Sequence, residues 1–366
     1  MKNVKTVGIL KPFRGTVRPM LEVYKQILDH NNISYIELDI NNASFWDDVS
    51  KIDLFLAKIS QTDDDLALAA QIIPVLNVFS KLCCFPDYQT VWHYDDKVKQ
   101  YYLLKRCGFP VIDTYIFWDK LKALDWATKT QYPVVFKLKG GAGSSNVKLV
   151  TKKHQAVSLI KKAFGRGIHP YYFDLPGKLK ASNYDMVKIS KYFLKPLYRK
   201  LVTGATPLSN YTRQKNYVYF QKFLPGNEYD TRVCILGSRA FAFKRFVRKN
   251  DFRASGSNNY DMNRDTIDKD FVRLAFSISK KLGFKSMAYD FVYDERHDPA
   301  LIEISYTYGD YPEFSTGYWD EDLVWHDGNY VPEYFELVDS LQMPDLKLPN
   351  IELDSPYKKA RMTKKA

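Results

Sequence analysis

Two acidic residues stand inside strongly apolar, strand-like runs, and this restricts the fold more than any other feature. Asp290 lies in MAYDFVYD (287–294) and Glu303 in ALIEISY (300–306). A buried charge without a partner is costly, so we expect the two runs to be adjacent strands that bring the carboxylates side by side. Paired carboxylate oxygens are typical Mg²⁺ ligands. The alternative is that one carboxylate pairs with a structural arginine.

The first 88 residues show the pattern of a parallel α/β domain. Short apolar runs alternate with a segment that has apolar residues at helical spacing. The predicted strands are 4–10, 33–38 and 52–57, the predicted helix is 18–30, and a last strand-like run spans 75–86 between two prolines.

The pattern changes from residue 89, where an α+β, largely antiparallel arrangement is predicted. The predicted helices are 89–107, 153–163 and 264–282, and the predicted strands are 217–224, 229–249, 286–294 and 300–306, with a strand, loop and strand over 132–150. We therefore expect an N-terminal α/β domain (1–88), a small central domain (89–215), a C-terminal antiparallel-sheet domain (216–345) and a basic tail (346–366).

A glycine-serine loop follows a lysine on an apolar strand. Lys137 stands just before GGAGSS (140–145). Backbone N–H groups and hydroxyls next to a fixed cation suit a polyphosphate. The alternative is a flexible turn with a solvated lysine, and the segment is not a Walker A motif because no Gly-Lys-Ser/Thr opens a helix.

The order of these motifs resembles the ATP-grasp superfamily over residues 1 to 310. The likeness is nearest to ribosomal-protein glutamate ligases around DTRVCILGSRAFAFKRFVRKNDFRASGS (230–257). The interval between Asp290 and Glu303 is similar to that of D-alanine–D-alanine ligases. EISYTYG and GYWDEDLVWHDG resemble ATP-grasp proteins of surface-polysaccharide gene clusters.

This resemblance implies that ATP and Mg²⁺ are the cofactors. The lysines and serines of the implied nucleotide site would face the phosphates, residues 221 to 224 the adenine, and the glutamate the ribose. The implied ATP-binding residues are Lys97, Lys137, Ser144, Ser145, Gln221, Lys222, Leu224 and Glu228.

The resemblance also implies a reaction centre. Arg245 would steady the transferring phosphoryl group or an acyl phosphate, and Arg253, in NDFRASGSN, would face the substrate unless that segment is a plain surface loop. Asp290, Glu303 and Ser305 would hold Mg²⁺. The family usually has Asn at the last position, and Ser is a weaker oxygen donor, so the number of metal ions stays open.

The implied activity is that of a ligase that forms a carbon–nitrogen (amide) bond. ATP would phosphorylate a carboxylate and an amine would attack the acyl phosphate. The implied substrates are small-molecule or lipid-linked carboxylates and amines in surface-polysaccharide or glycan modification. Two alternatives stay open: a phosphotransferase on a hydroxylated substrate, and a non-catalytic nucleotide-binding protein, for which Ser305 is the hint.

Charge favours an anionic partner. Lys and Arg number 54 against 42 Asp and Glu, a net charge of +12. Residues 178–215 form a basic insert with nine Lys or Arg and one acid, which predicts peripheral contact with an anionic membrane; the alternative is a solvated face, and nucleic acid ranks last. Sparse cysteines, and the lack of a signal-peptide pattern or a membrane-length apolar segment, predict a cytoplasmic protein at or near the inner membrane face.

Overall fold

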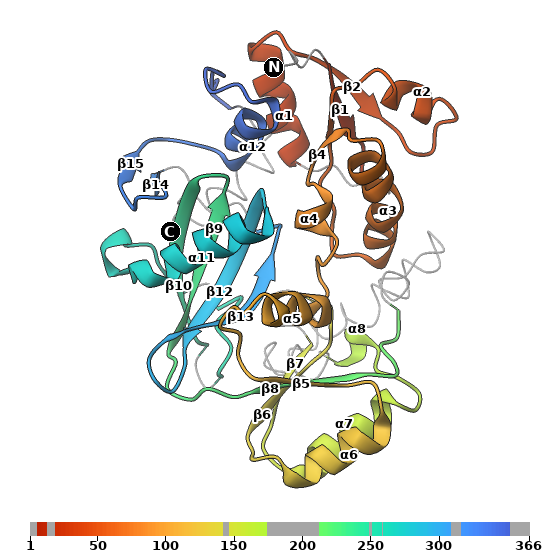
Figure 1. Ribbon diagram of the computed structural model, residues 1–366, viewed down its shortest axis with the longest axis vertical. Helices are drawn as coiled ribbons and strands as arrows, with labels where there is room; N and C mark the ends of the chain where they lie inside the picture. The colour runs from red at the N-terminus through yellow and green to blue at the C-terminus, as the bar shows by residue number, and fades with distance from the viewer. Residues whose placement is uncertain are drawn as a thin grey trace, which may run out of the picture.

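The structure is a computed structural model that describes residues 6–12, 19–141, 146–173, 212–248, 251–257, 259–308 and 316–351. The described residues form three sheets (Figure 1). Within the described residues, no helix combines the length and apolar character needed to span a membrane.

The first sheet is parallel, as predicted. Its strands lie in the order β2-β1-β3-β4, and four of the five residues of β1 are buried, as expected for a strand covered on both faces. The elements are β1 (Thr6–Leu10), α1 (Pro19–His30), β2 (Ser34–Leu38), α2 (Phe45–Val49), β3 (Leu54–Leu56), α3 (Asp63–Ile73) and β4 (Cys83–Phe85).

The predicted last strand of this domain is wrong over its first half. Pro74–Phe79 form a helical segment, η1, that continues α3, and β4 takes up only the end of the 75–86 run. Pro74 fits this continuous helical path because its fixed φ, here −59°, is a helical value.

The second sheet is antiparallel, with the order β5-β8-β6-β7. The predicted strand, loop and strand over 132–150 and the predicted helix over 153–163 are confirmed, and two helices cover the sheet through small side chains such as Ala127 and Ala156. The elements are β5 (Thr114–Phe117), α6 (Lys120–Lys129), β6 (Val134–Lys137), β7 (Val147–Val150), α7 (Lys153–Ala163), α8 (Pro170–Phe173) and β8 (Val218–Lys222).

The third sheet is also antiparallel and follows the order β13-β12-β9-β10-β14-β15, with β11 paired to β10. The predicted strand 229–249 is instead a hairpin, because Gly237 turns the chain with a φ of 57°. The elements are β9 (Tyr229–Leu236), β10 (Arg239–Phe246), β11 (Tyr260–Asp261), η2 (Arg264–Thr266), α11 (Lys269–Leu282), β12 (Ser286–Tyr293), β13 (Pro299–Ser305), β14 (Gly317–Trp319) and β15 (Trp325–Asp327).

The predicted helix 89–107 is divided into α4 (Tyr88–Val91) and α5 (Lys97–Arg106). Asp95 breaks the helix with a left-handed φ of 50°. Asp96 then accepts hydrogen bonds from the N–H groups of Val98 and Lys99, which caps α5. Lys97 is thereby the first residue of α5.

The chain finally returns to the first sheet through α12 (Pro332–Leu341), which lies beside α1 (Figure 1). Leu337 and Leu346 are buried against residues of β1 and α1, so the expected tail beginning at 346 starts as packed chain; residues 352–366 lie outside the described part. Glu336 binds Lys58 at 2.8 Å and accepts a hydrogen bond from Tyr24 of α1.

We expect Leu337→Ala to lower the free energy of unfolding by about 2–5 kcal/mol, because it removes a fully buried side chain between α12 and the first sheet. Urea unfolding followed by circular dichroism measures the effect. Leu121→Ala is the control, since Leu121 is 75% exposed and its loss should change little. Equal stabilities of the two variants would contradict the packing role of α12.

Candidate functional site

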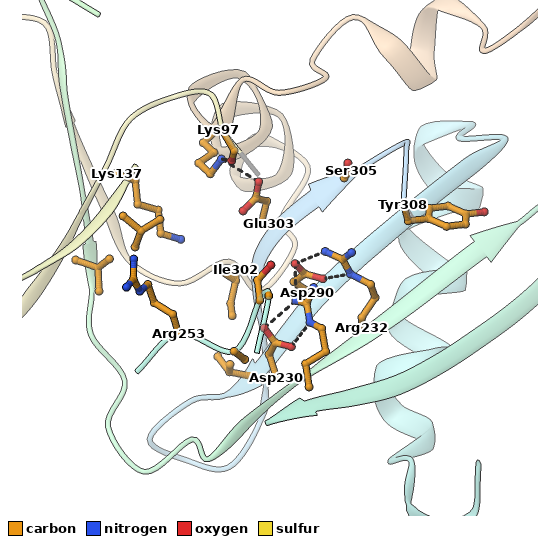
Figure 2. A pocket seen from close by; sticks show the side chains of 18 of the residues that line it. Lys97, Lys137, Asp230, Arg232, Arg253, Asp290, Ile302, Glu303, Ser305 and Tyr308 are labelled. Carbon is orange, nitrogen blue, oxygen red and sulfur yellow. Dashed lines mark hydrogen bonds and ion pairs between the residues drawn. The ribbon is translucent and has the colours of Figure 1, made fainter. Parts of the chain in front are cut away.

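A cavity of about 750 Å³ opens where the three sheets meet. Residues 58–61, after β3, line it from the first sheet. Lys137 and Gln221 line it from the second, and Asp290 and Glu303 from the third (Figure 2). The motifs that the sequence spreads over more than 200 residues therefore face one space.

Two buried lysines stand on one side of this cavity. Lys97 is 4% exposed, and its Nζ lies 2.9 Å from an oxygen of Glu303 and 2.9 Å from the carbonyl oxygen of Gly141. Burial alone would lower the pKa of Lys97, but the charges of Glu303 and Asp95 raise it. The charge of Lys97 is thus already balanced by the protein.

Lys137 is in a different electrostatic position. It is 5% exposed, and within the described part of the chain it makes no ion pair. Burial lowers the pKa of Lys137 to about 8, an effect that Glu303 partly offsets. Lys137 is therefore a buried cation that lacks a full counter-charge.

The two carboxylates occupy opposite positions on neighbouring strands, as predicted. Asp290 of β12 pairs in register with Glu303 of β13, and both line the cavity. Ser305 also lines it, and its hydroxyl donates a 2.7 Å hydrogen bond to the carbonyl of Thr307. The predicted metal ligands thus lie together on β12 and β13.

Asp290 is also held by arginines, which was the alternative interpretation. Arg232 donates to both oxygens of Asp290, at 2.7 and 2.8 Å, and Arg245 lies 2.8 Å from Oδ2. Arg245 also donates two hydrogen bonds, of 2.6 and 2.8 Å, to Asp230. Burial would raise the pKa of Asp290, yet Arg232 and Arg245 hold it well below its ordinary value.

The two arginines predicted to act on the substrate differ in their surroundings. Arg245 lines the cavity but is 2% exposed, and its guanidinium is occupied by Asp230 and Asp290. Arg253 lines the same cavity and pairs with Asp251 at 2.7 Å. The segment around Arg253 thus faces the cavity instead of forming a plain surface loop.

The residues expected to meet the nucleotide base are only partly placed as predicted. Gln221, Lys222 and Leu224 line the cavity. However, the backbone N–H of Lys222 already donates to the carbonyl of Asp113 at 2.8 Å, so that group is not free for a base. Its side chain turns to Glu295, at 2.6 Å.

Glu228 departs from its predicted place. It is exposed and does not line the cavity, whereas its neighbours Asn227 and Tyr229 do. The lining of the cavity therefore does not support the predicted ribose contact of Glu228. Ser144 and Ser145 lie outside the described residues, as does most of the basic insert 178–215.

Asp230 and Arg232 carry no predicted role, although both line the cavity and complete the charge network around Asp290. Their spacing of two in a strand places them on the same face. That spacing, in the motif EYDTRV, is the signal that could have identified them.

Sequence comparison finds no match, either to a protein-family model or to a curated protein. Solved structures do match. Biotin carboxylase from Campylobacter jejuni, a complex with β,γ-ATP, has a TM-score of 0.53 at 12% identity and covers 96% of this chain and 74% of its own.

Two further solved structures match at a similar level. The biotin carboxylase domain of the 2-oxoglutarate carboxylase of Hydrogenobacter thermophilus, a complex with MgADP, has a TM-score of 0.51 at 11% identity and covers 93% of this chain and 70% of its own. N5-carboxyaminoimidazole synthetase from Staphylococcus aureus has a TM-score of 0.51 at 12% identity, covering 95% and 80%.

We expect Lys137→Met to stabilise the empty protein at pH 7 by about 1–3 kcal/mol, because it removes a buried charge. The pKa of Lys137 falls from 10.5 to about 8 on folding. The gain should therefore be complete below pH 8 and disappear as the pH rises from 8 to 10.5, where unfolded Lys137 also loses its proton. Urea unfolding at several pH values measures this.

The matched control is Lys129→Met, since the side chain of Lys129 is 71% exposed. It should show neither the stabilisation nor the pH dependence. If Lys137→Met is no more stable than wild type at pH 7, the charge of Lys137 is already balanced by the protein.

Proposed function

Because the chain has the ATP-grasp fold, we propose that it is an ATP-dependent ligase that joins a carboxylate to an amine through an acyl phosphate. The observation that carries the proposal is the meeting of Lys97 and Lys137 with the Asp290–Glu303 pair in one cavity. Cations and hard oxygen ligands together suit a polyphosphate with its metal.

The two lysines have different parts in this proposal. Lys137, whose charge the protein leaves without a full partner, attracts the anionic phosphates, and their negative charge raises its pKa when they bind. Lys97 is already held by Glu303 and Gly141, so it supplies a fixed donor whose position does not depend on the nucleotide. Fixed charges cost no reorganisation when charge develops on a transferring phosphoryl group.

The oxygen-bearing side chains of β12 and β13 fit Mg²⁺. Glu303 and Asp290 supply carboxylate oxygens and Ser305 a hydroxyl oxygen on the same side of the cavity. Mg²⁺ is commonly held by one or two carboxylates together with phosphate oxygens, whose negative charge it neutralises. Asp290 and Glu303 therefore supply the number of carboxylates that a protein usually gives to Mg²⁺.

Arg232 and Arg245 make three contacts with the oxygens of Asp290, and in our proposal Asp290 exchanges one of them for the metal. A guanidinium released in this exchange lies next to the site of phosphoryl transfer. In our proposal Arg232 or Arg245 then binds the transferring phosphoryl group or the acyl phosphate, and Asp230 keeps Arg245 in place.

The substrate side of the proposal rests on Arg253. It lines the cavity together with Ser255, and a guanidinium is suited to bind a carboxylate substrate. We further propose that the substrates are small or lipid-linked molecules of surface-polysaccharide or glycan modification. We also propose that the enzyme contacts the inner face of the membrane.

A hydroxamate assay tests the reaction type. We expect the protein, with Mg²⁺, ATP, hydroxylamine and a panel of carboxylic acids, to release ADP and phosphate and form a hydroxamate with the acid it accepts, because hydroxylamine displaces phosphate from an acyl phosphate. A phosphorylated hydroxyl product without hydroxamate would identify a phosphotransferase. Nucleotide binding without turnover on any acid or alcohol would favour a non-catalytic role.

The metal ligands are tested by Glu303→Gln and Ser305→Ala. We expect Glu303→Gln to lower activity by at least tenfold more than Ser305→Ala, because a carboxylate supplies charge to Mg²⁺ and a hydroxyl does not. Ser305→Asn should be tolerated. Titrating Mg²⁺ at fixed ATP measures the dependence, and full activity of Glu303→Gln at limiting Mg²⁺ would exclude Glu303 as a ligand.

A further inference from the structure

Asp95 lies behind the glycine segment, on the side away from the main cavity. Gly141 lines the cavity of about 750 Å³, whereas Asp95 and Gly140 line a second cavity of about 460 Å³. The backbone at Gly140 and Gly141 therefore separates the two spaces. Asp95 is placed to act on this wall and not on a ligand in the main cavity.

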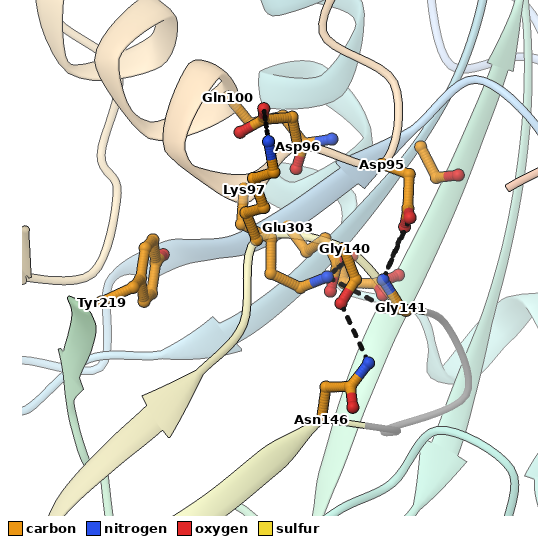
Figure 3. A network of polar contacts seen from close by, with 12 residues as sticks. Asp95, Asp96, Lys97, Gln100, Gly140, Gly141, Asn146, Tyr219 and Glu303 are labelled. Carbon is orange, nitrogen blue, oxygen red and sulfur yellow. Dashed lines mark hydrogen bonds and ion pairs between the residues drawn. The ribbon is translucent and has the colours of Figure 1, made fainter. Parts of the chain in front are cut away.

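Both polar backbone groups of Gly141 form hydrogen bonds with side chains (Figure 3). Its N–H donates to the carboxylate of Asp95, at 2.9 Å from Oδ1 and 3.1 Å from Oδ2. Its carbonyl accepts the 2.9 Å hydrogen bond from Lys97 Nζ. Asp95 and Lys97 are two residues apart, so one short piece of chain sets both contacts.

The local conformations are shaped for this contact. A Cβ at Gly140 would stand 2.7 Å from Oδ2 of Asp95, so a side chain there would push the carboxylate away. Asp95 itself has a φ of 50°, a left-handed conformation that Asp and Asn adopt more readily than most residues.

The charge on Asp95 strengthens the contact. Burial raises the pKa of Asp95 to about 6, while the charge of Lys97 and the Gly141 hydrogen bond oppose the rise and the charges of Glu303 and Asp96 add to it. The group is thus ionised at neutral pH, and the bond to Gly141 is charge-assisted.

We propose that Asp95 is a positioning residue, which fixes the start of the glycine loop against the phosphate end of the cavity. The inference rests on the proposed function, in which the loop meets the nucleotide phosphates. Asp95 holds Gly141 from behind while Lys97 holds it from the front, so Gly141 and Lys97 keep one fixed relation before the nucleotide arrives. Order that exists beforehand need not be created on binding, which favours affinity.

The test compares ATP with AMP, which lacks the β- and γ-phosphates, by isothermal titration of the full-length chain with Mg²⁺. Asp95→Gly removes the carboxylate and accepts the left-handed φ. We expect it to weaken ATP binding about tenfold, the size of one charge-assisted hydrogen bond, and to change AMP binding by less than about twofold. Asp95→Asn keeps one acceptor oxygen and should restore most of the ATP affinity.

The matched control is Asp119→Gly. The carboxylate of Asp119 accepts a 2.8 Å hydrogen bond from the N–H of Lys122 at the start of α6, so this variant loses a comparable bond away from the cavity. Its ratio of ATP to AMP affinity should equal that of wild type.

Gly140→Ala provides a second approach, since the added Cβ displaces the carboxylate from the loop side and decides the question if Asp95→Gly does not fold. It should show the same selective loss of ATP affinity. If either variant kept the wild-type ratio of ATP to AMP affinity, whether both affinities stayed the same or both fell equally, the positioning role of Asp95 would be overturned. The proposed function would not be affected by that result. A wild-type protein that binds neither nucleotide would contradict the proposed function as well.

Discussion

The site depends on the neutralisation of buried charge across three neighbouring strands. Asp230, Arg245, Asp290 and Arg232 alternate in sign along a chain of hydrogen bonds that joins β9, β10 and β12. Removing one member of such a buried network leaves an uncompensated charge, at a cost of about 3–5 kcal/mol. A shift of one residue in strand pairing would separate every pair, so the network fixes the register on which the position of Glu303 also depends.

The fold class was predictable from the sequence because it rests on local patterns. Alternating apolar runs identified the parallel sheet, and the glycine loop between 132 and 150 identified the hairpin of the second sheet. Asp290 and Glu303 could be paired because an apolar strand with one carboxylate needs a partner. The division of residues 89–107 was missed because the capping by Asp96 and the left-handed Asp95 compete with an otherwise continuous helical pattern.

The partners of each charge were less predictable, because they come from distant parts of the chain. Asp290 could take a metal or an arginine by sequence alone, and the choice between Arg232, Arg245 and an ion depends on how β9 and β10 align with β12. The exposure of Glu228, next to residues that line the cavity, likewise depends on packing that residue type does not reveal. Lys137 and Lys97 look alike in the sequence, yet within the described residues Lys97 forms an ion pair with Glu303 and Lys137 does not.

The return of α12 to the first sheet determines when, during synthesis, the first sheet can bury its apolar surface. The apolar surface of β1 and α1 stays without the cover of Leu337 and Leu341 until residues beyond 330 have left the ribosome. The first sheet is therefore the earliest to be made and the last to be closed. The second sheet, whose strands and helices lie between residues 114 and 222, has no such delay and can form while the first is still exposed.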